Sequence, residues 1–429
     1  MERLVVLGAG TAGTMAVNLL RRRLPRDRWQ ITVVDQDDDH LYQPGLLFLP
    51  FGRYTPRQLV RRRRRYVPDG VDFVQDRIAA VDADSGVVRL AGGATLPYDQ
   101  LVIATGVEPR PDQTPGMGDE QWRRSVFDFF TLDGATALRD RLRTWQGGRL
   151  VVHVTEMPIK CPVAPLEFAF LADAFLDRAG LRDRTDLTYV TPLDGAFTKP
   201  VASARLGGML DSRRIALEPD FVVERVDGRE DGDGGVLVSM DEREVPFDLL
   251  VTVPLNMGAE FVAESGLGDE LNYVPVDKHT LLSRAHDNVF AIGDATDLPT
   301  SKAGSVAHFS VELFADNFVE HIHGRPMTQA FDGHANCFVE SGHGKGLLID
   351  FNYDTQPLPG AYPIPGIGPM RLLGETRFNH WGKLAFRWMY WNVLLPGRPM
   401  PVPTLMSMAG KQPEERAMAE LAPAGQRAA

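Results

Sequence analysis

The N-terminal residues alternate between short apolar runs and one segment with helical spacing. Residues 4–7 form an apolar run, residues 11–20 are rich in Ala and Leu at helical intervals, and residues 31–34 form a second run. Short apolar runs on either side of a helical segment are typical of buried parallel strands joined by a crossover helix. The pattern therefore predicts a strand–helix–strand unit at the start of the chain.

A glycine-rich turn joins the first run to the helical segment. Gly8, Gly10 and Gly13 have the G-x-G-x-x-G spacing, and Asp35 follows the second run. The first glycine permits a tight bend, the second lets backbone amides approach a pyrophosphate, and the third lets the helix pack against the strand. An acid about twenty residues further on is placed to bind a ribose hydroxyl. The turn therefore predicts a dinucleotide at the helix N-terminus, with an ordinary glycine turn as the alternative.

The same alternation returns in the second quarter of the chain. Residues 150–154 and 187–190 are apolar runs, and residues 166–176 between them carry apolar side chains at helical spacing. This is again the order strand, helix, strand. We therefore predict a second α/β unit in this part of the chain.

The second unit has no glycine turn. Residues 155–162 read Thr-Glu-Met-Pro-Ile-Lys-Cys-Pro, so that Pro158 and Pro162 remove amide donors and Glu156 lies near the phosphate position. We interpret this unit as nucleotide-binding architecture without a nicotinamide site. A thiol, Cys161, stands close to the strand end, where open α/β sheets place their chemistry.

Two further apolar runs end in small or acidic residues that suit a flavin. One leads into Thr105 and Gly106, and the other leads into Gly293 and Asp294, whose carboxylate would meet a sugar-alcohol or ribose hydroxyl. Together with the N-terminal glycine turn, these strand ends predict FAD. Lys302 follows closely and would set a cation beside the flavin ring, which stabilises the reduced anionic form. A surface lysine is the alternative.

These patterns predict an α/β protein with two Rossmann-like domains and a C-terminal region. We assign residues 1–112 and 284–330 to a discontinuous FAD-binding domain, residues 113–283 to the second Rossmann-like domain, and residues 331–429 to the C-terminal region. A chain of 429 residues is longer than one hydrophobic core usually serves, which agrees with this division.

The C-terminal region contains an aromatic and basic helical stretch. Residues 378–395 include three tryptophans, with Lys383 and Arg387 among them. The stretch is too short and too charged to span a bilayer, but such a helix can lie among lipid headgroups. We predict an interfacial helix, and packing on the protein's own core is the alternative. For the arginines at 61–65, we predict a solvated helical face rather than contact with anionic lipid.

The net charge and the N-terminal residues limit the class of partner and the location that we expect. The net charge of −11 argues against general nucleic-acid binding, and residues 1–2 lead directly into the first strand, without a cleavable secretory segment. We therefore expect a cytoplasmic protein, peripheral on the inner face of the cell membrane.

Cys161 and Cys337 are too few for a zinc cluster, so we predict no metal and either a working thiol pair or a structural bridge. The last fifteen or so residues are expected to be frayed.

Taken together, the motifs resemble the sulfide:quinone oxidoreductases, a family of flavoproteins with two dinucleotide-binding domains. The resemblance covers roughly residues 1–400. Besides the motifs named above, it rests on residues 40–45, which include Gln43, on residues 299–302, and on Cys337 before residues 342–345. Residues 160–167, Lys-Cys-Pro-Val-Ala-Pro-Leu-Glu, are the most specific part.

The resemblance implies FAD held between the domains, with Cys161 and Cys337 on one side of its ring and Gln43 near the cofactor. Members of the family oxidise sulfide to polysulfide sulfur and pass two electrons to membrane quinone. Many carry a third cysteine, in some cases linked to the flavin, but residues 117–132, where it is expected, have none. We therefore expect non-covalent FAD and a two-thiol mechanism in which Cys337 faces the flavin and Cys161 carries the persulfide.

The same resemblance suggests that Glu167 handles protons, with His343 and Lys345 as weaker candidates nearby. A first-turn carboxylate stabilised by the helix dipole is an equal alternative for Glu167. Sulfide, quinone and the membrane surface are the implied partners, and a homo-oligomer is possible.

Two other functions stay open at this point. A type II NADH dehydrogenase shares the fold, FAD and quinone, but it requires a nicotinamide fingerprint near residue 155. A non-catalytic flavin-binding redox sensor would keep the N-terminal glycine turn but would have no use for two thiols at one ring face.

Overall fold

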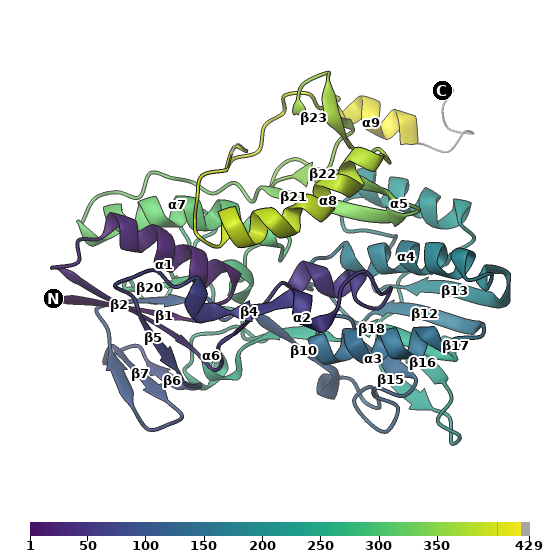
Figure 1. Ribbon diagram of the computed structural model, residues 1–429, viewed down its shortest axis with the longest axis horizontal. Helices are drawn as coiled ribbons and strands as arrows, with labels where there is room; N and C mark the ends of the chain where they lie inside the picture. The colour runs from purple at the N-terminus through teal and green to yellow at the C-terminus, as the bar shows by residue number, and fades with distance from the viewer. Residues whose placement is uncertain (401, 422–429) are drawn as a thin grey trace.

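The computed structural model describes residues 1–400 and 402–421, and two parallel sheets form its framework (Figure 1). Every neighbouring pair of strands in the first sheet is parallel. Its strand order is β20-β9-β1-β2-β5, with bounds β1 Glu2–Leu7, β2 Trp29–Asp35, β5 Asp72–Gln75, β9 Gln100–Ile103 and β20 Val289–Ala291. Helix α1, Thr11–Arg23, joins β1 to β2 and packs beside α7, Gly304–Ile322. The predicted N-terminal strand–helix–strand unit is confirmed.

The second sheet has the order β11-β18-β12-β13-β14 and is also parallel throughout. Its bounds are β11 Val126–Phe127, β12 Gly148–Val154, β13 Thr185–Val190, β14 Ala216–Glu218 and β18 Leu249–Val253. Helix α4, Ala164–Arg178, crosses from β12 to β13. Strand β18 is buried along its whole length, as expected where both faces of a parallel sheet are covered. The predicted α/β class with two Rossmann-like units is confirmed.

Smaller antiparallel sheets and connecting elements complete the two units. Strand β10 pairs with β19, so two segments far apart in the sequence run side by side between the large sheets. The bounds are β3 Asp39–Leu41, β4 Val60–Arg62, β6 Ile78–Asp82, β7 Val87–Leu90, β8 Thr95–Pro97, β10 Val107–Arg110, β15 Val223–Gly228, β16 Gly235–Ser239, β17 Glu244–Phe247 and β19 Leu255–Gly258. The remaining helices here are α2 Pro56–Leu59, α3 Leu132–Arg143, α5 Pro200–Ser212 and α6 Glu260–Glu264.

The arginine run does not form the predicted helical face. Its first part lies in strand β4, which pairs with β3, and Arg63 to Arg65 form a single 3₁₀ turn. The cause is a set of facing carboxylates: Arg62 and Arg64 contact Asp38, and Arg63 contacts Asp35. Ion pairs between the arginines and the carboxylates before β3 therefore replace the solvated helix.

A four-stranded sheet begins the C-terminal region. Its hairpin of β21, Ala335–Gly342, and β22, Lys345–Phe351, packs against α4, and α8, Arg377–Met389, lies along the hairpin (Figure 1). Strands β23, Gly360–Ile364, and β24, Gly368–Leu372, complete the sheet. Helix α9, Glu414–Leu421, occupies part of the segment predicted to be frayed, and residues 422–429 of that prediction lie outside the described residues.

Helix α8 has two different faces. Phe378, Trp381 and Trp388 are exposed by 51%, 55% and 65%, whereas Lys383 is turned inward and Trp391, just beyond the helix, is buried. Packing on the protein's own core, the alternative prediction, therefore holds for the inner face of α8, and the interfacial role of its exposed face stays a prediction. Among the described helices, none is long and apolar enough to cross a membrane.

Candidate functional site

The N-terminal glycines have the geometry that a dinucleotide turn requires. Gly8 has φ +96°, and a Cβ on it would lie 2.5 Å from the Ala104 carbonyl oxygen. A Cβ on Gly13 would lie 1.9 Å from the Gly8 carbonyl oxygen, so these two glycines allow helix and strands to approach. A Cβ on Gly10 would meet no atom within 4 Å. Open space therefore lies beside the backbone at the start of α1, where a pyrophosphate is expected.

Asp35 ends β2 beside this turn, and it has two partners. Its Oδ2 accepts the Ala9 N–H at 2.7 Å and lies 3.1 Å from Arg63 Nη1. Burial raises the pKa of Asp35, and the Arg63 guanidinium opposes that rise. Arg63 also donates to the Ala9 carbonyl oxygen at 2.9 Å, so the structure adds an arginine to the predicted dinucleotide site. Sequence reasoning missed it, because nothing in a run of five arginines singles out one member.

The strand ends predicted to bind flavin meet around α1. Thr105 Oγ1 is buried and has no hydrogen-bond partner among the described residues, and a Cβ on the adjacent Gly106 would meet nothing within 4 Å. Gly293 approaches α1 so closely that a Cβ would lie 2.8 Å from that of Ala12. Burial raises the pKa of Asp294, and the nearby Lys302 and Lys160 oppose the rise. A buried hydroxyl without a partner, an open glycine position after β9 and another at the N-terminus of α1 fit FAD.

Lys302 makes its contacts inside the protein. Its Nζ donates to the carbonyl oxygens of Asp294 at 3.0 Å and Thr296 at 2.7 Å, and lies 3.7 Å from the centre of the Tyr273 ring. Burial lowers its pKa to about 8. Lys302 therefore braces the Gly293–Ala295 turn, and its predicted contact with the flavin ring stays a prediction.

Two further residues bear on the cofactor prediction. Lys160 is a second cation of this region and is half-buried: desolvation lowers its pKa, and Asp294 is the largest opposing influence. Gln43 is exposed at the start of a 3₁₀ turn, and its contact with the cofactor also stays a prediction.

Cys161 is held in a constrained backbone conformation ahead of α4. Its φ is +49°, in the left-handed region, which costs a residue with a Cβ on the order of 1–3 kcal/mol. Its N–H donates to the Lys302 carbonyl oxygen at 2.7 Å, and its carbonyl accepts the Ala164 N–H at 2.8 Å. These bonds fix the thiol between the second sheet and the segment that precedes α7.

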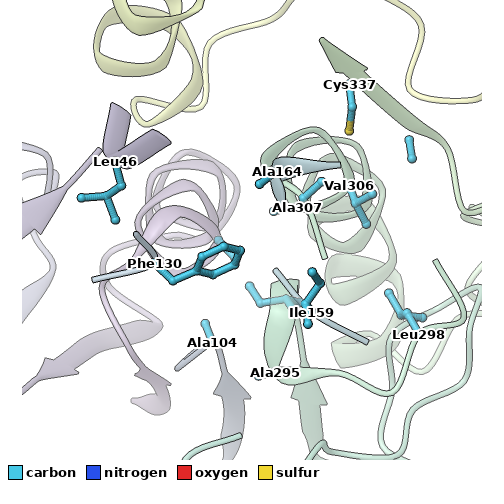
Figure 2. Close-up of a cluster of buried hydrophobic side chains, with 14 of the residues drawn as sticks. Leu46, Ala104, Phe130, Ile159, Ala164, Ala295, Leu298, Val306, Ala307 and Cys337 are labelled. Carbon is cyan, nitrogen blue, oxygen red and sulfur yellow. The ribbon is translucent and has the colours of Figure 1, made fainter. Parts of the chain in front are cut away.

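Cys337 reaches the same region from strand β21. Figure 2 shows its side chain directed towards Val306 and Ala307 of α7 and towards Ala164 of α4. Both cysteines are free thiols, and Cys337 is close enough to contribute to the raised pKa of Cys161, of which burial is the main cause. The structure therefore brings the two predicted thiols to one site, where Cys337 is buried and Cys161 is half-buried.

Glu167 lies in the first turn of α4, behind the thiols. It is fully buried, its Oε1 accepts the Glu340 N–H at 2.6 Å, and the Lys383 ammonium donates to the same oxygen. Lys383 also donates to the Phe338 carbonyl oxygen at 3.0 Å. Burial raises the pKa of Glu167 to about 7, and Lys383 opposes the rise. A carboxyl with this pKa can gain and lose a proton near neutral pH, as acid–base catalysis requires.

Next to this ion pair is a pocket of about 250 Å³. Glu340 is buried in its wall, where both carboxylate oxygens lie 2.9 Å from His380 Nδ1. His343 also lines the pocket, while Lys345 is exposed at the other end of the hairpin turn. The other lining residues are Phe48, Phe51, Arg53, Leu171, Arg178, Gly342 and Gly344. Sequence reasoning missed Glu340 and His380, because no local pattern pairs an acid on a strand with a histidine on a distant helix.

Comparisons with known proteins agree with this fold and site. Residues 2–153 match the family described as pyridine nucleotide-disulphide oxidoreductase. The chain is 25% identical over 404 residues to the mitochondrial sulfide:quinone oxidoreductase of Dictyostelium discoideum, covering 93% of this chain and 87% of that one. The mouse mitochondrial protein of the same name is also 25% identical, covering 92% and 86%. The solved sulfide:quinone oxidoreductase of Aquifex aeolicus has a TM-score of 0.76 at 18% identity, covering 93% and 92%.

These similarities first indicate the general class of protein. The chain is a flavoprotein oxidoreductase that takes FAD, as the sequence predicted. Within that class, its resemblance to the sulfide:quinone oxidoreductases is confirmed along nearly the whole chain.

Proposed function

We propose that the protein oxidises sulfide with Cys161 and Cys337 and passes two electrons through FAD to quinone, forming sulfane sulfur. The observation that carries this proposal is the convergence of two thiols from separate elements on one site beside Glu167 and Lys383. The names of the relatives supply the substrates, because proteins similar over more than nine-tenths of this chain are called sulfide:quinone oxidoreductases.

The thiol chemistry proceeds by exchange. In the bridged pair, hydrosulfide attacks the Cys161 sulfur, the bond between the cysteines breaks, Cys161 keeps a persulfide, and Cys337 leaves as thiolate with the electron pair. FAD, when bound, supplies the two-electron acceptor that allows the pair to re-form around the added sulfur. Burial raises the pKa of both thiols, that of Cys337 only to about 11 and that of Cys161 further. Since the thiol of lower pKa leaves faster, this difference favours Cys337 as the leaving group.

The proton released from sulfide needs an acceptor near the thiols. Glu167 has a pKa of about 7 and an Oε2 without a hydrogen-bond partner among the described residues. Its other oxygen is held by Lys383 and by the backbone at Glu340, the residue that pairs with His380 at the pocket wall. We therefore assign proton transfer to Glu167, with the Glu340–His380 pair between it and the pocket.

The surface around α8 is suited to membrane contact. The exposed face of α8 presents Phe378, Trp381 and Trp388, and the nearby hairpin exposes Ile364 and Ile367. Large aromatic side chains on one face of a helix suit the headgroup region of a bilayer. We propose that this surface lies on the cytoplasmic face of the cell membrane and brings the site close to membrane quinone.

The type II NADH dehydrogenase alternative has weaker support. Between β12 and α4, the pyrophosphate of a nicotinamide dinucleotide would require free backbone amides. The chain has Pro158 and Pro162 there, and Pro165 lies in the first turn of the helix, so these positions lack an N–H. This loop carries Cys161 instead. A non-catalytic flavin-binding redox sensor would not require two thiols at one site, so this alternative does not explain why Cys161 and Cys337 lie close together.

The test is sulfide-dependent reduction of a soluble quinone analogue by purified, FAD-loaded protein. We expect Cys161→Ser and Cys337→Ser each to reduce the rate by at least a factor of about 10³, because loss of an exchange partner stops the cycle. FAD absorbance should be unchanged in both variants. Near-full activity in either one would contradict the two-thiol mechanism.

A further inference from the structure

A serine stands beside Cys337. Ser305 lies in the first turn of α7, and its Oγ is 3.9 Å from Cys337 Sγ. The same oxygen accepts the N–H of Asn336 at 3.2 Å. While the thiol is protonated, either group can donate in this contact. Once Cys337 is a thiolate, the serine hydroxyl holds the hydrogen of the pair and donates it to the sulfur.

The position of Ser305 in its helix favours negative charge on that sulfur. Helix α7 has 19 residues, its N-cap, Ala303, makes no side-chain hydrogen bond, and its first turn holds no acid. The first amides of such a helix and the positive end of its dipole stabilise an anion nearby, and a thiolate at a helix N-terminus is the known case for cysteine.

The charged groups around Cys337 come from three other elements, and each has partners of its own. Lys383 of α8 and Glu167 of α4 form an ion pair. Asp350 of β22 is bound by three groups, namely His334 at 2.8 Å, Asn336 at 2.9 Å and Lys411 at 2.5 Å. Burial raises the pKa of Cys337, and the Ser305 hydrogen bond is the largest opposing influence, ahead of Lys383.

We propose that Ser305 is a positioning residue for Cys337: its hydroxyl donates to Sγ and stabilises the thiolate released when the bridge to Cys161 opens. This inference rests on the proposed function in one respect: it assumes that Cys337 is a thiol that reacts. It concerns the thiol itself, so it can be tested without sulfide or quinone.

The experiment uses the FAD-loaded Cys161→Ser protein, in which Cys337 is the single thiol. The rate of alkylation by iodoacetamide is followed by intact mass from neutral to alkaline pH, because only the thiolate reacts. Ser305→Ala should raise the apparent pKa of Cys337 by about half to one unit and slow alkylation at neutral pH about three- to tenfold. Ser305→Thr should restore the original profile, since it keeps the hydroxyl.

Ser310→Ala is the matched control, because Ser310 lies on the same helix and its hydroxyl donates to the Ala307 carbonyl oxygen. We expect the Cys337 profile to be unchanged in this variant. Flavin absorbance and thermal melting report whether each variant is folded. An unshifted profile in folded Ser305→Ala protein, or an equal shift in Ser310→Ala, would overturn the proposal.

A second readout links the serine to turnover. In the protein with both thiols, Ser305→Ala should move the pH profile of sulfide-driven flavin reduction to higher pH, because the released Cys337 thiolate would then have a higher pKa and be protonated over a wider pH range. If the unmodified protein does not react with sulfide while the alkylation shift is still present, the proposed function fails but the role of Ser305 at the thiol stands.

Discussion

The Tyr390 hydroxyl lies 2.8 Å from the Thr11 hydroxyl, so the segment that follows α8 touches the first turn of α1. The same phenol oxygen is 2.7 Å from His40 Nε2. Burial lowers the pKa of His40 to about 3, so its imidazole is neutral and these are hydrogen bonds between neutral groups. The segment next to the exposed aromatic face is therefore joined directly to the glycine turn predicted to hold FAD.

Tyr390→Phe should weaken FAD retention. The change removes the hydrogen bonds that the Tyr390 hydroxyl makes with Thr11 and with the buried His40. A loss of about 1–3 kcal/mol in unfolding free energy is expected. Thermal melting and the fluorescence of released flavin measure the effect. Tyr353→Phe is the control, since it removes a hydrogen bond to the Lys278 carbonyl oxygen instead. Equal flavin release from the two variants would contradict this account.

Glu167→Gln should remove a pH dependence from the reaction. A base with a pKa of about 7 is mostly protonated in mild acid, so sulfide-driven flavin reduction should rise with pH through that value. The variant should lack this rise and be about 10²- to 10⁴-fold slower above it. Stopped-flow absorbance at several pH values is the measurement. A variant with the same rising limb would assign the proton transfer to another group.

The same carboxyl predicts how stability changes with pH. Its pKa is raised in the folded protein above the ordinary value of 4.5, so the folded state binds the proton more tightly than the unfolded state. The stability from this group is present below about pH 4.5 and is lost as the pH rises through about 7.

Lys383→Met should therefore destabilise the protein more at high pH than at low pH. Removing one partner of a buried ion pair costs about 3–5 kcal/mol, and protonation of Glu167 relieves part of that cost in acid. Urea unfolding at two pH values measures the difference. Arg387→Met is the control on the same helix, where the guanidinium lies 4.9 Å from the centre of the Tyr54 ring. A deficit independent of pH would show that Glu167 is not the group left unpaired.

Replacing Trp381 and Trp388 by Ser should reduce binding to anionic lipid vesicles while leaving the fold intact. The two indoles are more than half exposed, so their loss removes apolar area from the proposed membrane surface without opening the core. Vesicle flotation reports binding, and thermal melting reports stability. Trp391→Phe should lower thermal stability and leave vesicle binding unchanged. Trp391 is buried, and its ring stacks on that of Tyr66 with the ring centres 5.3 Å apart. Flotation unchanged by the double substitution would mean that another surface meets the membrane.

The strands, crossover helices and glycine turn could be predicted because their signals are local. Apolar runs and G-x-G-x-x-G spacing lie within a few residues of the structure that they specify. The pairing of charges could not be predicted in the same way: Lys383 meets Glu167 across 216 positions of sequence. Arg63 was likewise hidden in a run of like charges, and its contacts with Asp35 and with the Ala9 carbonyl oxygen, which distinguish it, are visible in the structure alone.

Helix α8 shows why a pattern can support two interpretations. Its aromatic and basic residues are typical of an interfacial helix, and its exposed tryptophans agree with that. Yet Lys383 points into the protein, because it forms an ion pair there with the buried Glu167 carboxylate. Ser305 gave no signal in the sequence, since a serine at the start of a helix is common and Cys337 arrives from a distant strand.

The most direct test of the account is the anaerobic absorbance of the bound flavin on mixing with sulfide, with NADH in a parallel cuvette. We predict bleaching by sulfide, recovery on adding a soluble quinone analogue, and no bleaching by NADH. Bleaching by NADH alone would contradict the account and assign the second domain to a nicotinamide substrate.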